Sequence, residues 1–235
     1  MTSQHTVPRL HVLTGPNGGR DVLRTIEAAL AAGAPGVQVR VKGATDRDHL
    51  AFASAVVERC RAAEATCIVN DRVDLALASG ADGVHLGATD LPVRTARELA
   101  GDRLLIGGTA REPDAAARLV AEGADYLGCG PLYTTTTKDG LPDPIGFDTL
   151  AAIVRTVDVP VIGISGITAE RIGEVLASGA HGVAVTAAIT SAADPAQATR
   201  ELLAELEGAA PVLPAMTSTR SSGTATGPTG AQVEP

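Results

Sequence analysis

The stretch TCIVNDRVDLALASGADGVHL, residues 66–86, holds a complete strand–helix–strand unit. Thr66–Val69 is a short apolar run, typical of a strand that is buried on both faces. Val73–Ser79 follows as a short helix, and a Gly-Ala pair ends it before the next apolar run, Gly83–Leu86. Parallel strands joined by helices are the units of α/β folds. This stretch therefore predicts parallel strands with helices packed against them.

The same alternation continues on both sides of this unit. Further strands are expected at Leu10–Leu13, Gly36–Arg40, Leu104–Ile106, a run beginning at Tyr126, Val159–Ile164 and Gly182–Val185. Further helices are expected at Asp21–Ala32, Asp46–Glu64, a segment opened by Pro92, Pro113–Glu122, Phe147–Thr156, a segment capped by Thr168, and Asp194–Glu207. Gly-Ala pairs recur at the ends of alternate helices. This recurrence predicts an α/β fold that is a single (β/α)8 TIM barrel rather than an open sheet.

The domain organisation follows from a change in composition near residue 208. Residues 1–207 carry the strand and helix pattern, and we interpret them as one domain. Residues 208–235 are rich in Ser, Thr, Gly and Pro and show no apolar period. Such a segment has no apolar face to add to a core, so a disordered tail is expected there.

Composition and charge exclude several classes of protein. The formal net charge is −8 and no long basic run occurs, which argues against a nucleic-acid partner. Cys60, Cys67 and Cys129 are widely spaced, which favours free thiols in a reducing cytoplasm. The chain shows no apolar stretch of membrane-spanning length and no secretory pattern at its start. We therefore expect a cytoplasmic protein with small-molecule partners. Its oligomeric state stays open, with a homo-oligomer among the options.

A loop of hydroxyl groups follows the strand that begins at Tyr126. Gly130 and Pro131 indicate a turn, and four consecutive threonines, residues 134–137, precede Lys138. Four β-branched polar residues form a poor helix. Hydroxyl donors ending in one cation suit a phosphate or pyrophosphate group. The alternative is a solvated threonine-rich loop without a ligand.

Polar residues also gather at the other expected strand ends, where a TIM barrel carries its active site. The candidates are Gln38, Arg40, Lys42, Asn70, Asp71, Asp90, Thr109, Thr135, Thr136, Thr137, Lys138, Gly166, Thr186 and Ala187. Two carboxylates among several cations suit Mg²⁺, which takes one or two carboxylates together with phosphate oxygens and waters. Small residues after the last two strands suit a phosphate cup made of backbone N–H groups.

Each of these candidates has a structural alternative. Asp71 and Asp90 both precede a helix, so either could be a helix cap rather than a metal ligand. Arg40 could form an ion pair within the barrel. His85 faces no evident partner in the sequence pattern, and we interpret it as a packed strand residue rather than a base.

Several motifs in this order resemble those of the thiamine phosphate synthase family over residues 9–206. The motifs are Gln38-x-Arg40-x-Lys42, Asn70-Asp71-Arg72-Val73-Asp74, Gly83-Val84-His85-Leu86-Gly87-x-x-Asp90, Gly130-Pro131-x-Tyr133-x-Thr135-x-Thr137-Lys138 and Gly182-Val183-Ala184-Val185. The resemblance implies a transferase of thiamine biosynthesis. Its reaction replaces the pyrophosphate of hydroxymethylpyrimidine diphosphate by the ring nitrogen of thiazole phosphate, giving thiamine phosphate and pyrophosphate.

The resemblance also implies roles for the candidates. Asp71 and Asp90 would bind Mg²⁺, and the cations Arg40, Lys42 and Lys138 would be catalytic by stabilising the leaving pyrophosphate. The pyrimidine diphosphate would be held by Gln38, Arg40, Lys42, Asn70, Thr109 and Lys138. The thiazole phosphate would be held by Thr135, Thr136, Thr137, Gly166, Thr186 and Ala187.

The chain departs from the family pattern at four positions, and two other functions remain open. Thr109 stands where Ser is usual, Arg111 where His is usual, Val41 where an acidic residue is common, and Ala187 where Ser is common. A thiazole tautomerase shares the fold, but its relatives lack the threonine loop and the second carboxylate. A catalytically silent phosphate-binding barrel would need the cations without the carboxylate pair.

Overall fold

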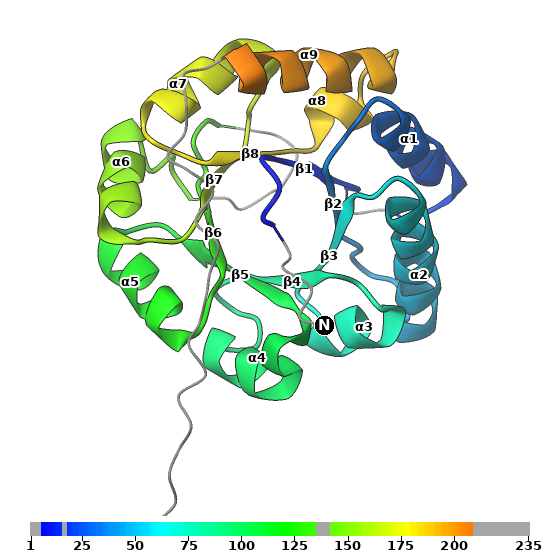
Figure 1. Ribbon diagram of the computed structural model, residues 1–235, viewed down its shortest axis with the longest axis horizontal. Coiled ribbons are helices and arrows are strands. Elements are labelled where there is room, and N and C mark those ends of the chain that lie inside the picture. Colours follow the sequence, from blue (N-terminus) through cyan, green and yellow to red (C-terminus); the bar gives the residue numbers. More distant parts are fainter. Residues whose placement is uncertain (1–5, 16–17, 135–141, 209–235) are drawn as a thin grey trace, which may run out of the picture.

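The computed structural model describes residues 6–15, 18–134 and 142–208, and shows eight parallel strands in a closed barrel (Figure 1). The strands are β1 (Leu10–Leu13), β2 (Gly36–Val39), β3 (Thr66–Asn70), β4 (Gly83–Leu86), β5 (Leu105–Ala110), β6 (Tyr126–Cys129), β7 (Val161–Ile164) and β8 (Gly182–Val185). Each strand pairs with the next one in the chain, and β8 pairs with β1. The TIM barrel expected from the sequence is confirmed.

Helices surround the barrel on its outside (Figure 1). They are α1 (Arg20–Ala31), α2 (Asp46–Ala62), α3 (Val73–Ser79), α4 (Val93–Ala100), α5 (Pro113–Glu122), α6 (Phe147–Thr156), α7 (Ile172–Ala177), α8 (Ala187–Thr190) and α9 (Pro195–Gly208), with 3₁₀ turns η1 (Gly101–Arg103) and η2 (Ala169–Arg171). Their apolar residues recur on one face, as in α1, which buries Ile26, Ala29 and Leu30. That face packs on the strands.

The strands are buried on both faces because helices cover one face and the barrel interior fills the other. In β3, Cys67 and Val69 belong to the core between strands and helices, while Ile68 belongs to a smaller cluster inside the barrel. This cluster also contains Leu105 and Tyr126. The near-continuous apolar runs of the sequence follow from this double burial. Cys60, Cys67 and Cys129 are buried and free.

Several elements, such as β2, β3, α1 and α2, differ from the sequence expectation by one or two residues at their ends, and four further differences have a structural cause or were not foreseen. β5 continues through Gly107 and Gly108 to Ala110, because these residues pair with β6 along its whole length. β7 begins after Pro160, which has no N–H to donate to a neighbouring strand. Thr168 does precede η2, but its side chain makes no cap hydrogen bond. The short helix α8 was not expected.

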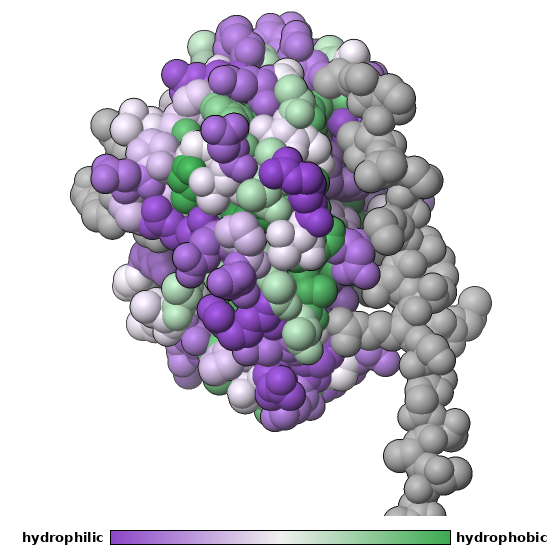
Figure 2. Space-filling model, turned by 90° about the vertical axis from the view of Figure 1, so that its left-hand side faces the viewer, coloured by the Kyte–Doolittle hydropathy of each residue, from purple (hydrophilic) through white to green (hydrophobic). Residues whose placement is uncertain are grey.

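The chain ends outside the described part of the structure. The last helix, α9, extends to Gly208, one residue beyond the end at Glu207 that the sequence predicts. The rest of the expected tail, residues 209–235, lies outside the described residues. Within the described residues, no helix combines the length and apolar character needed to cross a bilayer. Figure 2 shows one face of the molecule, where polar residues dominate and apolar residues occur in small groups.

Candidate active site

The carboxyl ends of β2, β3 and β4 bring the first group of candidate residues together. The Lys42 ammonium forms an ion pair with Oδ2 of Asp71, and the Asn70 amide donates a hydrogen bond to Oδ1 of the same carboxylate. The Asp71 carboxylate is also a close neighbour of Asp90 and raises the pKa of that group. Four residues that lie up to 48 positions apart in the chain thus meet at one end of the barrel, as the sequence analysis expected.

Asp71 owes its position to an unusual backbone conformation. Its φ is +68°, in the left-handed region that Asp tolerates better than most residues. The Asp71 N–H donates to the His85 carbonyl at 2.8 Å, which ties the turn after β3 to β4. The helix-cap alternative is wrong for Asp71, because Arg72 is the N-cap residue of α3 and no side-chain cap bond is made there. The carboxylate points to Lys42 and Asn70 instead.

Asp90 is held from the loop after β4. Its Oδ2 accepts a hydrogen bond of 2.7 Å from the Gly87 N–H. The cap alternative is wrong here too, because Pro92 is the N-cap residue of α4 and no side chain caps that helix. Burial raises the pKa of Asp90, and the neighbouring Asp71 carboxylate raises it further. Two carboxylates in contact repel one another unless a proton or a cation lies between them.

This pair fits a hard divalent cation that also binds substrate. Among the described residues, no group of three or more His, Cys, Asp or Glu side chains is arranged to hold a metal ion. A site of that size would suit a metal held by protein alone, whereas Mg²⁺ commonly takes one or two carboxylates and completes its shell with phosphate oxygens and water. Asp71 and Asp90 therefore match the second kind of site.

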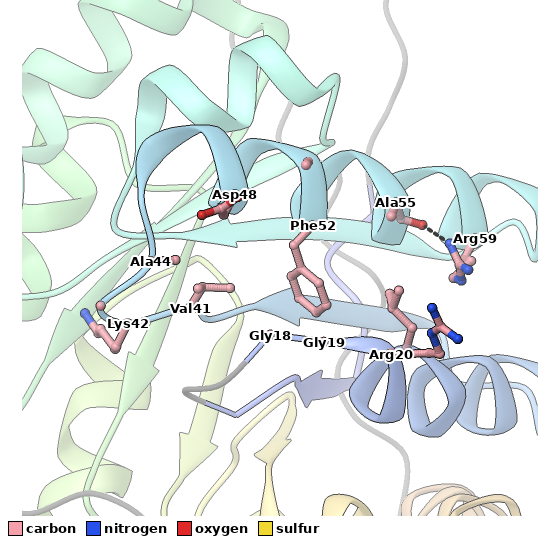
Figure 3. Close-up of a pocket in the computed structure, with 13 residues that line it drawn as sticks. Gly18, Gly19, Arg20, Val41, Lys42, Ala44, Asp48, Phe52, Ala55 and Arg59 are labelled. Atoms are coloured by element: carbon pink, nitrogen blue, oxygen red, sulfur yellow. Dashed lines mark hydrogen bonds between the residues drawn. The ribbon is translucent and has the colours of Figure 1, made fainter.

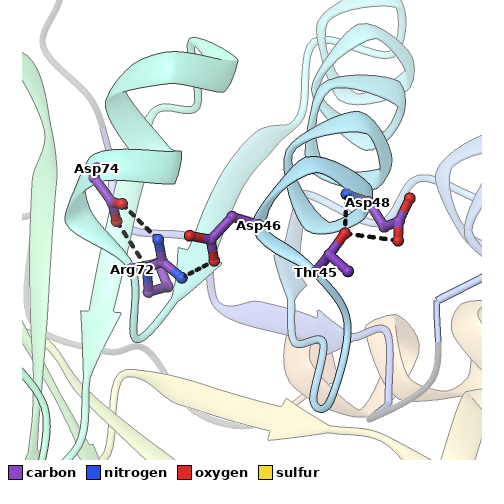
Figure 4. A network of polar contacts seen from close by, with 5 residues as sticks. All are labelled: Thr45, Asp46, Asp48, Arg72 and Asp74. Atoms are coloured by element: carbon purple, nitrogen blue, oxygen red, sulfur yellow. Dashed lines mark hydrogen bonds and ion pairs between the residues drawn. The ribbon is translucent and has the colours of Figure 1, made fainter.

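Ion pairs of Arg72, the residue that follows Asp71, connect the starts of α2 and α3 (Figure 4). Arg72 donates to Oδ1 of Asp46 on α2 at 2.6 Å, and it binds both carboxylate oxygens of Asp74 on α3 at 2.8 and 2.6 Å. These hydrogen bonds lower the pKa of both carboxyl groups. Thr45 caps α2 by accepting from the Asp48 N–H at 3.2 Å. The starts of α2 and α3 are thereby fixed on either side of Asp71.

A second group of polar side chains fills the interior of the barrel. His85 Nδ1 lies 3.1 Å from the Tyr126 hydroxyl, and His85 Nε2 lies 3.0 Å from the Thr109 hydroxyl. Burial raises the pKa of the Tyr126 hydroxyl, and the nearby side chain of buried Gln38 acts in the opposite direction. Burial lowers the pKa of His85 to about 4, so the imidazole is neutral at neutral pH. The expectation that His85 has no partner is wrong.

Arg40 and Arg111 occupy the rim. The Arg40 N–H donates to the Thr14 hydroxyl at 2.9 Å, and that hydroxyl donates to the Arg40 carbonyl at 3.1 Å. Within the described residues Arg40 makes no ion pair, so the ion-pair alternative finds no support there. Arg111, which departs from the family pattern, donates to the Asp143 carbonyl at 2.9 Å. Arg111 is thus hydrogen-bonded to the segment that follows the threonine-rich stretch.

The far side of the rim contains the small residues after β7 and β8. Ser165 and Gly166 both have positive φ, at +81° and +68°, which makes a sharp turn. Arg171 donates to the Gly166 carbonyl, and its guanidinium lies 4.2 Å above the ring of Tyr133. The sequence analysis did not single out Arg171 for this site.

The remaining candidates lie at the start of α8 or outside the described residues. Thr186 is the N-cap residue of α8, and Ala187 is its first residue. Thr135, Thr136, Thr137 and Lys138 lie outside the described residues. Their predicted contacts with phosphate groups stay predictions.

A groove of about 710 Å³ lies outside the barrel between α1 and α2 (Figure 3). Phe52 and Leu23 give it an apolar floor, and Arg20 and Arg59 lie at its side. Lys42 lies at one end of the groove and is the one predicted site residue among its lining residues. Asp71, Asp90 and Asn70 do not line the groove, which meets their cluster only through Lys42, the partner of Asp71.

Three comparisons place this chain among known proteins. A family model described as thiamine monophosphate synthase matches residues 10–189. The chain is 50% identical over 194 residues to a thiamine-phosphate synthase of Salinispora arenicola, which covers 81% of this chain and 93% of that protein. It is 47% identical over 201 residues to the same enzyme of Salinispora tropica, covering 84% and 97%. Among solved structures, a thiamine phosphate pyrophosphorylase from Pyrococcus furiosus superposes with a TM-score of 0.76 at 34% identity, over 85% of this chain and 95% of that one.

Proposed function

The chain belongs to the thiamine monophosphate synthase family, and we propose that it joins hydroxymethylpyrimidine diphosphate to thiazole phosphate. The products are thiamine phosphate and pyrophosphate. The observation that carries this proposal is the contact between Asp71 and Asp90, with Lys42 bound to Asp71 at the same strand ends. A barrel that only bound phosphate would need the cations but not two carboxylates in contact.

The residues of this site support a reaction that separates charge. As the bond between the pyrimidine methylene carbon and the diphosphate oxygen breaks, its electron pair stays on the pyrophosphate. Lys42 and Arg40 follow β2 at the rim, and we infer that they stabilise that growing negative charge. Such stabilisation would accelerate the step, because the charge is greatest in the transition state. The new bond forms from the lone pair of the thiazole nitrogen. This nucleophile carries no proton in its reactive form, so no general base is required.

We propose Mg²⁺ as the metal of this site, bound by Asp71 and Asp90. When bound, it would neutralise part of the charge on the diphosphate oxygens. The closeness of the two carboxylates supports this assignment, because a cation between them would offset their mutual repulsion. Lys42, now paired with Asp71, would then be free to bind a diphosphate oxygen.

The residues after β7 and β8 are proposed to bind the thiazole phosphate. Gly166 packs closely against Tyr133, since a Cβ atom at Gly166 would lie only 2.7 Å from the Cβ of Tyr133, so this sharp turn requires glycine. Ala187 has no hydroxyl to offer, so it would contribute its backbone N–H, and Thr186 would contribute its hydroxyl.

The location and partners follow from simple physical features. We propose that the protein works in the cytoplasm, supported by its three buried free thiols, which a reducing compartment preserves. The net charge of −8 makes nucleic acid a poor partner. The proposed partners are therefore the two phosphorylated substrates.

An end-point assay tests the proposed function. The purified protein is incubated with both substrates and Mg²⁺, and thiamine phosphate is quantified with and without a chelator. We expect product that disappears with chelator and returns when Mg²⁺ is added in excess. Product that persists in chelator would contradict the metal assignment. Absence of product from protein with a native circular-dichroism spectrum would contradict the synthase function.

A further inference from the structure

We propose that Tyr126 and His85 are positioning residues that set which way Gln38 and Thr109 hydrogen-bond to the pyrimidine substrate. The inference rests on the proposed function, because it assigns Gln38 and Thr109 to the pyrimidine. Gln38, Tyr126, His85 and Thr109 form one row across β2, β6, β4 and β5, in which His85 is hydrogen-bonded to Tyr126 and Thr109 and the Gln38 side chain lies beside the Tyr126 hydroxyl. Its two outer members are predicted substrate contacts, and its two inner members have no other role in the proposed reaction.

The fold reserves space for the two inner rings. A Cβ atom at Gly107 on β5 would lie 2.2 Å from Cζ of Tyr126 and 2.5 Å from Nδ1 of His85. A Cβ atom at Gly128 on β6 would lie 2.8 Å from Cε1 of His85. The rings thus occupy the volume that side chains of β5 and β6 would otherwise fill. They cannot turn away from one another without opening the packed interior.

The chemistry of the inner residues links the two ends of the chain. A neutral imidazole donates at one ring nitrogen and accepts at the other, and a phenol hydroxyl has one proton to donate. The hydrogen bonds must therefore all run in one direction. When His85 donates to Thr109, the threonine keeps its own proton for the substrate, and the Gln38 amide donates to Tyr126 and keeps its carbonyl oxygen for the substrate. If all the hydrogen bonds ran in the opposite direction, Thr109 would offer the substrate an acceptor in place of a donor, and Gln38 would offer a donor in place of an acceptor.

This coupling would give the site its preference for an aminopyrimidine. The amino group of the substrate is a donor and the neighbouring ring nitrogen is an acceptor, while an oxo analogue reverses that pattern. A buried site whose donors and acceptors are fixed rejects the reversed pattern, because a polar group would be left unpaired. A site whose end groups rotate freely would adapt to both. Tyr126 and His85 are accordingly specificity-determining through Gln38 and Thr109.

The test measures binding and turnover in a double-mutant cycle of Tyr126→Phe and Thr109→Val. Calorimetry with the pyrimidine diphosphate and Mg²⁺ gives its dissociation constant, and kinetics give the KM of each substrate. We expect Tyr126→Phe to weaken pyrimidine binding about tenfold, as loss of one buried hydrogen bond does. The KM of thiazole phosphate should not change. In the Thr109→Val background the same substitution should weaken binding less than about twofold, because residues of one network are not additive.

Two further variants separate positioning from loss of stability. Thr199→Val removes another buried hydroxyl bond, from Thr199 on α9 to the Pro195 carbonyl at 2.8 Å, far from the barrel interior. It should lower the urea midpoint without changing either KM. His85→Gln breaks the chain at a second point and should reduce the preference for the aminopyrimidine over the oxo analogue, as Tyr126→Phe does.

The outcomes are distinct for this inference and for the proposed function. The positioning role would be overturned if the effects of Tyr126→Phe and Thr109→Val on the dissociation constant simply multiply. It would also be overturned if Tyr126→Phe and His85→Gln leave the preference between the two pyrimidines unchanged. Turnover by the wild type would stand in both cases. The wild-type protein could bind the pyrimidine diphosphate, and the variants could show the expected coupling, while no thiamine phosphate forms. That result would support the positioning role and overturn the synthase function. Wild-type protein that does not bind the pyrimidine diphosphate would overturn both.

Discussion

Asp71→Asn is expected to reduce kcat by a hundredfold to a thousandfold, on the order of the loss when one preorganised electrostatic group is removed from an active site. Asparagine keeps the size of the side chain and tolerates the left-handed backbone at φ +68°, so the turn after β3 is retained. The substitution removes the charge that is proposed to bind Mg²⁺ and that pairs with Lys42. Steady-state kinetics over a series of Mg²⁺ concentrations measure both kcat and the concentration needed for half activity.

The double variant Asp71→Ala with Asp90→Ala should have no measurable turnover and a native circular-dichroism spectrum. Asp102→Asn is the matched control, because this exposed carboxylate lies on η1, where the chain enters β5 at the opposite end of the barrel. It should retain wild-type kcat and the wild-type Mg²⁺ requirement. Turnover that survives in the double variant would show that the carboxylate pair does not bind the metal.

The fold was predictable because its local signals agree with one another. Short apolar runs, helices with one apolar face, and Gly-Ala pairs between them all indicate the same repeated unit. The end of β5 could not be predicted in this way. Gly107 and Gly108 weaken a strand locally. They belong to β5 because both neighbouring strands pair with them, β4 through His85 and Leu86 and β6 through Tyr126 and Leu127.

The rim of the site was predictable from the sequence, and its interior was not. A polar residue directly after an apolar strand stands out, as Asn70, Asp71 and Lys42 do. Asp71 is excluded as a helix cap because Arg72 is the N-cap residue of α3, and its left-handed backbone angle is one that no sequence pattern reveals. The link between His85 and Tyr126 depends on rings meeting across a barrel from strands 41 residues apart. The nearest sequence signal is the pair of glycines that makes room for them, Gly107 and Gly128.

Acidification is expected to destabilise the protein through His11, which lies inside the barrel and is 1% exposed. Burial is the main cause that lowers its pKa from 6.5 to about 3, and the neighbouring His85 lowers it further. The unfolded chain takes up the proton near pH 6.5, while the folded protein does so only near pH 3. Stability from this residue is thus complete above pH 6.5 and is lost as the pH falls toward 3. The loss is at most about 1.4 kcal/mol per pH unit.

The variant His11→Gln isolates this contribution. Urea unfolding between pH 7 and 4.5 gives the free energy of unfolding of each protein, and carboxylates contribute equally to both. His11→Gln should be less stable than wild type at pH 7, because its bond to the Pro8 carbonyl at 3.0 Å is altered, but its stability should fall less steeply. Thr199→Val is a control that is also less stable, and it should keep the wild-type slope. Equal slopes for wild type and His11→Gln would mean that the folded barrel admits a charge beside Tyr126. The barrel interior would then be more hydrated or more mobile than the close ring contacts of His11, Tyr126 and His85 indicate.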